Sequence, residues 1–310
     1  MADHTRAKNI CYVTLNIQHG LVREHIRSGG RAVVLESGIN GEMITIYDKG
    51  AHIPLLWTHL IPATLEGKAT HNVQNAMFAA AMAFSLDKTL DEIRHGLRTF
   101  DTSFFQAPGR MNVFDEHAFR VILDYGHNAA SIEQMSQLAS KLEVAGKRIV
   151  VLAGPGDRRD EDLENIGHAA AGHFDLYICK ADDDRRGRAP DETPQMIAAA
   201  LRESGVPDTA IQVIADEQEA INAALDAAEP DDLVIIFGDA ITRCWKQITK
   251  YNREGDDLAI RQTEVRSAEP KVTPMMQSDE QNPFVLDAGM KLVTDERGVR
   301  LVETLDEESD

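Results

Sequence analysis

From residue 110 onward, short apolar segments alternate with amphipathic ones. The segments "RIVVLAG", "DLYICKA", "IQVIAD" and "DLVIIFG" are rich in Val, Ile and Leu. A helical pattern of about 12 residues follows each of them, starting near residues 160, 193, 217 and 240. Strands that are apolar on both faces are typical of a parallel sheet covered by helices. The pattern therefore predicts an α/β fold with a doubly wound, mainly parallel, Rossmann-like sheet, entered through a hairpin of "RMNVFDEH" and "FRVILDY".

The residues before this region have another pattern. Residues 1–66 are β-rich, with strands expected at "ICYVTLN", "RAVVLESG", "EMITIYD" and "HIPLLW" and one short helix at "LVREHIRSG". An alanine-rich helix is predicted at 70–84, with Thr70 or Asn72 as its N-cap. Thr89 and Glu92 predict a capping box at the start of a second helix. The first strand is expected at an exposed sheet edge.

The change of pattern near Pro108 and Gly109 predicts two folded parts and a tail. We place them at residues 1–106, 107–251 and 252–310. The last segment loses its periodicity, gains charge and ends in "ETLDEESD". We expect an acidic, largely irregular tail with a strand pair near 284–302.

The net charge and the cysteine spacing exclude several classes of partner and of site. The formal net charge is −19, and such a surface repels nucleic acid and anionic lipid, so neither is expected as a partner. No apolar run reaches the roughly 20 residues of a membrane span, and the first residues lack a signal-peptide core. The three cysteines have no CxxC spacing, which argues against disulfides and cysteine zinc sites. A cytoplasmic location is expected.

Polar residues follow the predicted strands at their carboxyl ends, where open α/β sheets bind ligands. Asp124 ends one strand, before Tyr125, His127 and Asn128. Its carboxylate suits the two hydroxyls of a ribose, and Arg110, one hairpin away, suits a phosphate. His127 has the alternative interpretation of a histidine satisfied within its turn.

Two further turns, "GPGDRRDED" and "ADDDRRGR", mix acid with arginine. Gly154 and Gly156 allow close approach of a ligand to the backbone before a helix N-terminus. Asp and Arg together suit a zwitterionic amino acid. The alternatives are that Asp157 and Asp160 cap the following helix, and that 182–188 is a solvated charged loop. Neither turn is a phosphate-binding P-loop, because the chain contains no GxxxxGK[ST] sequence.

The segments "THNVQNAMFAAAMA", "APGRMNVF", "VILDYGHNAAS", "GPGDRRDED" and "DDDRRGR" resemble, in this order, the end of the central domain and the whole C-terminal domain of the Mur ligase family. The likeness covers about residues 10–251. The last two segments are most similar to members that build an aspartate–arginine polymer.

The resemblance implies that residues 1–106 are the α/β end of a Mur-type central, ATP-binding domain. It implies an ATP-dependent ligase that adds arginine, or lysine, to side-chain carboxylates of poly-aspartate through an acyl phosphate. ATP and Mg²⁺ are the implied cofactors, and the full enzyme is expected to be a homo-oligomer.

The resemblance also assigns residues to two sites, although it identifies no catalytic residue and no metal ligand within this chain. The implied ATP contacts are His71, Asn72, Asn75, Arg110, Asp124, Tyr125, His127 and Asn128. The implied amino-acid contacts are Gly154, Gly156, Asp157, Arg158, Arg159, Asp160, Asp182, Asp183, Asp184, Arg186 and Arg188.

The chain departs from the family pattern in two ways. The family's DYAHNP is here "DYGHNA", with Gly126 and Ala129 as small replacements. More importantly, the P-loop and the magnesium ligands would precede residue 1. We therefore expect a C-terminal fragment that is inactive alone, because phosphoryl transfer needs a phosphate cradle and a metal.

Two rival interpretations remain. One is a non-catalytic truncated paralogue that binds nucleotide, arginine or polymer. A genuine ribosome-binding site with a stop codon upstream of the start would favour it, whereas an in-frame GxxxxGKT in the same gene would favour the ligase. The other is an unrelated Rossmann dehydrogenase, against which the absence of GxGxxG after a strand counts.

Overall fold

The computed structural model describes residues 7, 9–252, 290–295 and 298–303. The chain divides into two units, Met1–Arg253 and Glu254–Asp310. In the second unit, β11 (Met290–Asp295) and β12 (Gly298–Glu303) form an antiparallel pair, which confirms the strand pair predicted near 284–302. The remainder of the predicted irregular tail lies outside the described residues.

The first sheet of the larger unit has the strand order β1-β2-β3-β4. Its strands are β1 (Cys11–Thr14), β2 (Arg31–Gly38), β3 (Gly41–Asp48) and β4 (Ala51–Trp57). β1 is parallel to β2, and the other pairs are antiparallel. These four predicted strands are confirmed, as is the helix α1 (Gly20–Arg27) between the first two. β1 lies at the edge of the sheet, as expected.

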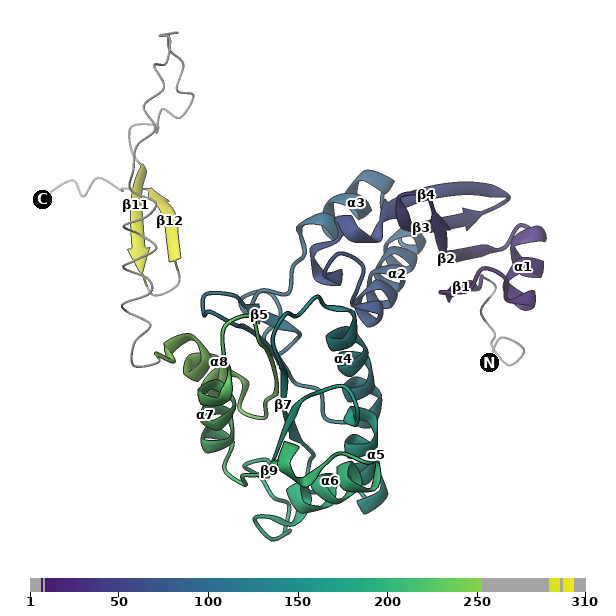
Figure 1. The fold of residues 1–310 in the computed structure, drawn as a ribbon. Helices are drawn as coiled ribbons and strands as arrows, with labels where there is room; N and C mark the ends of the chain where they lie inside the picture. Colours follow the sequence, from purple (N-terminus) through teal and green to yellow (C-terminus); the bar gives the residue numbers. More distant parts are fainter. Residues whose placement is uncertain (1–6, 8, 253–289, 296–297, 304–310) are drawn as a thin grey trace, which may run out of the picture. The chain divides into compact units, whose positions relative to one another are not determined.

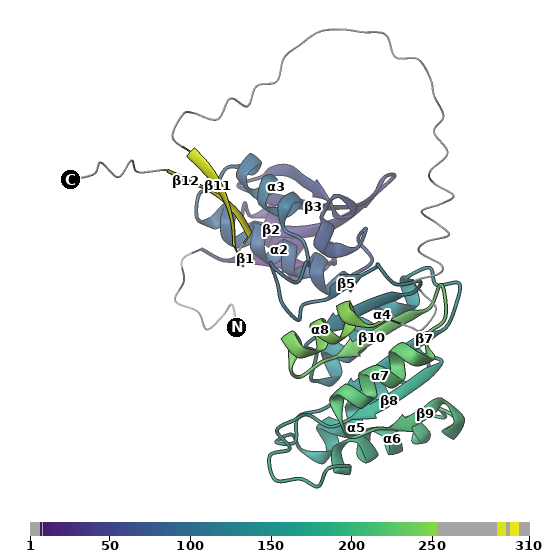
Figure 2. The ribbon, with the colours of Figure 1, turned by 90° about the vertical axis from the view of Figure 1, so that its left-hand side faces the viewer.

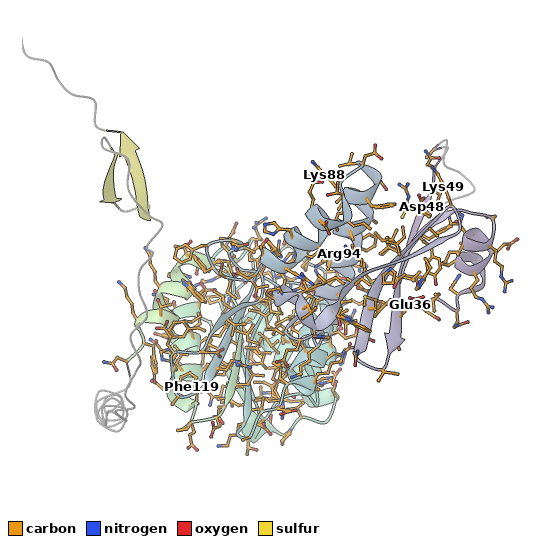
Figure 3. The ribbon with its side chains drawn as sticks, turned by 90° about the horizontal axis from the view of Figure 1, so that it is seen from above. Glu36, Asp48, Lys49, Lys88, Arg94 and Phe119 are labelled. Atoms are coloured by element: carbon orange, nitrogen blue, oxygen red, sulfur yellow. The ribbon has the colours of Figure 1, made fainter. Side chains whose placement is uncertain are left out.

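Two helices cover this sheet, α2 (Thr70–Ser85) and α3 (Leu90–Thr99). Apolar strand residues such as Ile44 and Ile46 share one buried cluster with Val73 and Met77 of α2. The capping box of α3 is confirmed, and Arg94 donates from α3 to backbone carbonyls of β4 (Figure 3). The predicted cap of α2 is wrong.

The N-cap of α2 is Ala69, without a side-chain hydrogen bond. The two residues expected to cap it bind elsewhere. Asn72 donates to the carbonyl of Ala63, and Thr70 accepts from Lys141. Their position inside the first turn, rather than before it, explains the error.

The second sheet has the order β5-β6-β10-β7-β8-β9. Its strands are β5 (Asn112–Phe114), β6 (Arg120–Asp124), β7 (Arg148–Ala153), β8 (Leu176–Lys180), β9 (Ile211–Val213) and β10 (Leu233–Phe237). β5 pairs antiparallel with β6, which confirms the predicted hairpin, and the other pairs are parallel. β10, the last of these strands in sequence, lies between β6 and β7 and is hydrogen-bonded to both.

Helices cover both faces of this sheet (Figures 1 and 2). They are α4 (Ala129–Lys141), α5 (Asp160–Ala170) and α6 (Glu192–Glu203) on one face, and α7 (Glu217–Ala227) and α8 (Ile241–Lys250) on the other. Alternate strand residues point to the two faces. Val150 and Ile235 pack with α4 to α6, whereas Val151 and Ile236 pack with α7 and α8. The predicted doubly wound, mainly parallel α/β sheet is confirmed.

Candidate functional site

A cavity of about 400 Å³ lies between α2, the turn before β5 and the start of α4. Five of the residues predicted to contact a nucleotide line it: His71, Asn72, Asn75, Arg110 and Asp124. They come from segments that are far apart in sequence, and the fold brings them to one cavity.

Asp124 sits at the carboxyl end of β6 and holds the local backbone. One carboxylate oxygen accepts from the N–H of Met111 at 2.8 Å and the other from the N–H of Gly126 at 2.7 Å. Burial raises the pKa of Asp124, and these N–H groups, His71 and Arg110 oppose that rise. A carboxylate offers about four lone-pair sites, so both oxygens can still accept from a ligand.

His71 provides a polar atom without a partner. Its Nδ1 is buried and makes no hydrogen bond in the described part of the chain. Burial lowers the pKa of His71, against the opposing effect of Asp124. Next to it, Asn75 donates to the amide oxygen of Asn72 at 3.1 Å. Because His71 lines the cavity, a ligand bound there is one source of the missing hydrogen-bond partner.

A larger, apolar cavity of about 580 Å³ adjoins the first and shares Asn72, Asn75 and Arg110 with it. Its remaining lining includes the alanine face of α2 and Leu97 of α3. An apolar cavity with a few polar groups at one side suits the flat ring of an organic ligand.

A third cavity, of about 180 Å³, opens at the carboxyl edge of the six-stranded sheet. Both charged turns predicted to bind an amino acid contribute to it, through Asp157, Arg158, Asp182, Asp184 and Arg186. Two residues predicted for the nucleotide, Tyr125 and His127, line this cavity instead of the first. The cavity also includes Asp239, which the prediction did not include.

Arg188, in the second charged turn, forms hydrogen bonds to the first. Its guanidinium donates to the carbonyls of Gly156 and Arg158 and to Asp160. A Cβ added to Gly156 would lie 2.2 Å from the carbonyl oxygen of Arg185. The close approach that Gly156 allows is therefore to the neighbouring turn. Gly154 is likewise packed against the Leu163 side chain of α5.

Most other charged groups of the turns pair with one another. Arg186 contacts Asp184 at 2.6 Å and Asp157 at 3.5 Å, and Arg159 contacts Asp162 at 2.7 Å. The 182–188 segment is thus mostly exposed but ion-paired.

The capping alternative is wrong for Asp157 and Asp160, because the N-cap of α5 is Arg159 and it makes no side-chain cap bond. The alternative interpretation of His127, a histidine satisfied within its own turn, agrees with its contact in the structure. Its Nδ1 lies 3.0 Å from the carbonyl oxygen of Tyr125. Asn128 caps α4 in a capping box with Ser131.

A buried ionic cluster, which sequence reasoning missed, lies beside the third cavity. Lys180 and Glu217, with side chains 0% and 1% exposed, form an ion pair at 2.9 Å. Arg243 pairs with Glu217 and, at 2.8 Å, with Asp183. The N–H of Asp239 donates to Glu217 at 2.7 Å. Burial alone would raise the pKa of Glu217, but Lys180, this N–H and Arg243 lower it to about 2.

The signal for this cluster was present in the sequence. Lys180 ends β8, Glu217 begins α7 just after β9, and Arg243 follows β10. Each therefore lies at the carboxyl edge of the sheet, the same edge that predicted the charged turns.

The described residues also bear on metal binding and membrane spanning. Within them, no group of three or more His, Cys, Asp or Glu side chains is arranged to hold a metal ion. None of the described helices combines the length and the apolar character needed to cross a bilayer.

Comparisons with known proteins give consistent similarities. Residues 109–240 match the family model for the Mur ligase, glutamate ligase domain. The chain is 39% identical over 252 residues to a cyanophycin synthetase of Nostoc sp., covering 80% of this chain and 27% of that protein. It is 40% identical over 256 residues to the cyanophycin synthetase of Trichormus variabilis, with the same 80% and 27% coverage. The chain thus spans only about a quarter of the length of these relatives.

Among solved structures, the folylpolyglutamate synthase of Mycobacterium tuberculosis, complexed with ADP and AMPPCP, matches with a TM-score of 0.51 and 20% identity. The match covers 80% of this chain and 57% of that one. At this level of identity the likeness concerns the fold.

Proposed function

We propose that this chain, whose residues 109–240 match the family model for the Mur ligase, glutamate ligase domain, forms the C-terminal part of an ATP-dependent ligase that joins an amino acid to a carboxylate. In this proposal residues 1–106 are the end of the central ATP-binding domain and 107–251 the C-terminal domain. The similarity to cyanophycin synthetases supports arginine, with lysine as the alternative, as the amino acid. The same similarity supports aspartate side chains of a polymer as the acceptors. The full enzyme would act in the cytoplasm as a homo-oligomer.

The proposed chemistry has two steps. A carboxylate oxygen of the acceptor attacks the γ-phosphorus of ATP, so that ADP leaves and an acyl phosphate forms. The α-amine of the incoming amino acid then attacks the acyl carbon, loses a proton and expels inorganic phosphate. Catalysis of such a sequence depends mainly on positioning the two reactants.

The described residues would bind and orient the reactants. We assign His71, Asn72 and Asn75 to the base, Asp124 to the ribose and Arg110 to the phosphates. The observation that carries the proposal is the cavity of about 180 Å³, in which acids and arginines of both charged turns meet beside the turn that follows Asp124. An arginine substrate needs an anion for its guanidinium and a cation for its carboxylate.

Binding of arginine to the purified chain tests the amino-acid site. Asp182 is the sharpest target, because it lines the cavity and its nearest cation, Lys180, is 3.6 Å away. We expect Asp182→Asn to raise the Kd for arginine at least tenfold, about 1.4 kcal/mol, in calorimetric titrations, with ADP affinity little changed. The matched control, Asp191→Asn, alters an exposed aspartate at the start of α6. Equal effects of both variants would remove Asp182 from the site.

Turnover tests the assignment of phosphate binding. Because the chain contains no GxxxxGK[ST] sequence, we expect no arginine-dependent ADP release from the purified 310-residue protein. Release at rates above a heat-inactivated control would contradict this expectation.

A second candidate function is a non-catalytic module that binds nucleotide, arginine or polymer. Binding of arginine and ADP by a chain that supports no ligation, even with its relatives' substrates supplied, would support the module.

A further inference from the structure

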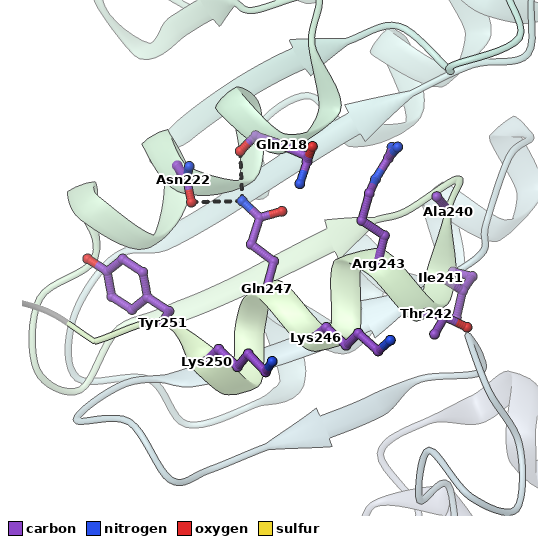
Figure 4. A pocket seen from close by; sticks show the side chains of 10 residues that line it. All are labelled: Gln218, Asn222, Ala240, Ile241, Thr242, Arg243, Lys246, Gln247, Lys250 and Tyr251. Atoms are coloured by element: carbon purple, nitrogen blue, oxygen red, sulfur yellow. Dashed lines mark hydrogen bonds between the residues drawn. The ribbon is translucent and has the colours of Figure 1, made fainter.

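An open groove of about 860 Å³ runs between α7 and α8. Figure 4 shows its lining side chains rising from these two neighbouring helices. Three cations, Arg243, Lys246 and Lys250, come from α8, and no aspartate or glutamate is among the lining residues. Arg243 is already ion-paired with Glu217 and Asp183, so Lys246 and Lys250 are the cations that make the groove complementary to an anion.

The lysines of the groove are available to a ligand. Lys246 and Lys250 are exposed, and neither has an ion pair among those found within the described residues. On α8, residues 243, 246 and 250 are three and four positions apart, which places them on one helical face over about 10 Å.

Three amide side chains, Gln218, Asn222 and Gln247, also line the groove. Gln247 reaches from α8 to α7, donating to the carbonyl of Gln218 at 2.8 Å and to the side chain of Asn222 at 2.7 Å (Figure 4). Amides suit the N–H and C=O groups of a polypeptide backbone. The groove therefore offers cations for acidic side chains and amides for a main chain.

The spacing of the cations fits an extended acidic peptide. Lys246 and Lys250 are separated by four residues, a rise of about 6 Å along α8. In an extended chain, side chains on the same face recur every second residue, roughly 6.6 Å apart. Two aspartates at alternate positions would thus meet the two lysines.

Arg243 links the groove to the charged turn that contributes to the candidate amino-acid site. This residue lines the groove and also pairs with Asp183 of the charged turn. We propose that the α7–α8 groove binds an extended, aspartate-rich peptide and directs it toward the cavity at the carboxyl edge of the sheet. The identity of this peptide as the acceptor polymer rests on the proposed function, whereas its acidic character follows from the groove.

Peptide binding to the full 310-residue chain tests the proposal. The probe is a fluorescently labelled octa-aspartate peptide, followed by anisotropy at low ionic strength. We expect saturable binding, and a Kd at least tenfold higher for the double variant Lys246→Glu, Lys250→Glu. Arg243 stays unchanged, because it also positions Asp183.

The matched control is the double variant Lys49→Glu, Lys147→Glu, which changes the net charge equally. Both of its lysines are exposed, and neither lines this groove. We expect it to bind the peptide within about twofold of the unaltered chain. Circular dichroism and urea unfolding of both double variants establish that each is folded.

Three outcomes would overturn the proposal. They are no binding at millimolar peptide, equal weakening by the two double variants, and equally strong binding of a single-stranded DNA of the same charge. The last would indicate a general anion surface in place of a peptide site. This experiment measures peptide binding and does not depend on ligase turnover. Its result can therefore be interpreted even if the chain proves not to be part of a ligase.

Discussion

Asp124 combines two tasks at one residue, because the carboxylate that faces the candidate nucleotide cavity also fixes two backbone N–H groups. We expect Asp124→Ala to lower the free energy of unfolding by roughly 2–3 kcal/mol, since both N–H groups lose their acceptor. Asp124→Asn should lose about half as much, because its amide oxygen still accepts from one of them. Urea unfolding measures both values, and a neutral Asp124→Ala would contradict the prediction. Glu143→Ala, at an exposed glutamate, is the control.

In a ligase-competent parent enzyme, the same substitution should raise the KM for ATP more than it lowers kcat. Ribose contacts contribute about equally to the ground and transition states. Steady-state kinetics with varied ATP test this, and an unchanged KM would remove Asp124 from the nucleotide site.

Glu217 should make stability dependent on pH. Its pKa is lowered from 4.5 to about 2 in the folded protein, so protonation favours the unfolded state. The stability that its charge contributes is complete above about pH 4.5 and is lost as the pH falls toward 2. We expect this loss to be about 3 kcal/mol, measured by urea unfolding at several pH values.

Glu217→Gln should remove this acid-dependent component while destabilising the protein at neutral pH, because Lys180 and Arg243 lose their buried partner. Leu225→Ala, a core truncation in α7, is the control. It should reduce stability by about 2–5 kcal/mol with a pH slope like that of the unaltered protein. A Glu217→Gln variant with the original slope would refute the assignment.

At the scale of elements, the contact between the two charged turns depends on Gly156. A Cβ there would lie 2.2 Å from the Arg185 carbonyl oxygen, which is backbone and cannot rotate away. We expect Gly156→Ala to separate the turns and to weaken arginine binding at least tenfold, while ADP binding changes little. Gly20→Ala at the start of α1, where a Cβ also meets nothing within 4 Å, should leave both affinities unchanged. Calorimetric titration with each ligand measures the effects.

The elements were predictable because their signals are local. The apolar runs that became β7, β8 and β10, and the Thr89–Glu92 capping box, are patterns within a few residues. The two charged turns could be grouped because the carboxyl ends of parallel strands lie at the same edge of a sheet, where ligands bind. By contrast, the pairing of Glu217 with Lys180 and with Arg243 joins residues 37 and 26 positions apart. Which strand ends become neighbours depends on sheet order, and no local pattern encodes that order.

At the scale of the whole molecule, the reactivity of the buried cysteines measures how far the structure has unfolded. Cys179 and Cys244 are fully buried, and burial raises the pKa of each to about 12. Their reactive thiolates are therefore scarce at pH 8. We expect native alkylation to label the half-buried Cys11 first, and the other two only when urea unfolds the chain. Mass spectrometry of digested protein measures this, and equal native rates for all three would contradict it.

The central position of β10 constrains how the chain reaches its folded state during synthesis. Before residues 233–237 leave the ribosome, β6 and β7 have no strand between them, because each is paired to β10 and not to the other. The β5–β6 hairpin and the β7–β8–β9 group must therefore wait as separate pieces, with unpaired edges, for the last strand to insert. The pairing partners Leu123 and Ile236 lie more than a hundred residues apart, which makes this closing step slow. Nascent chains stalled before β10 would be the form most in need of a chaperone.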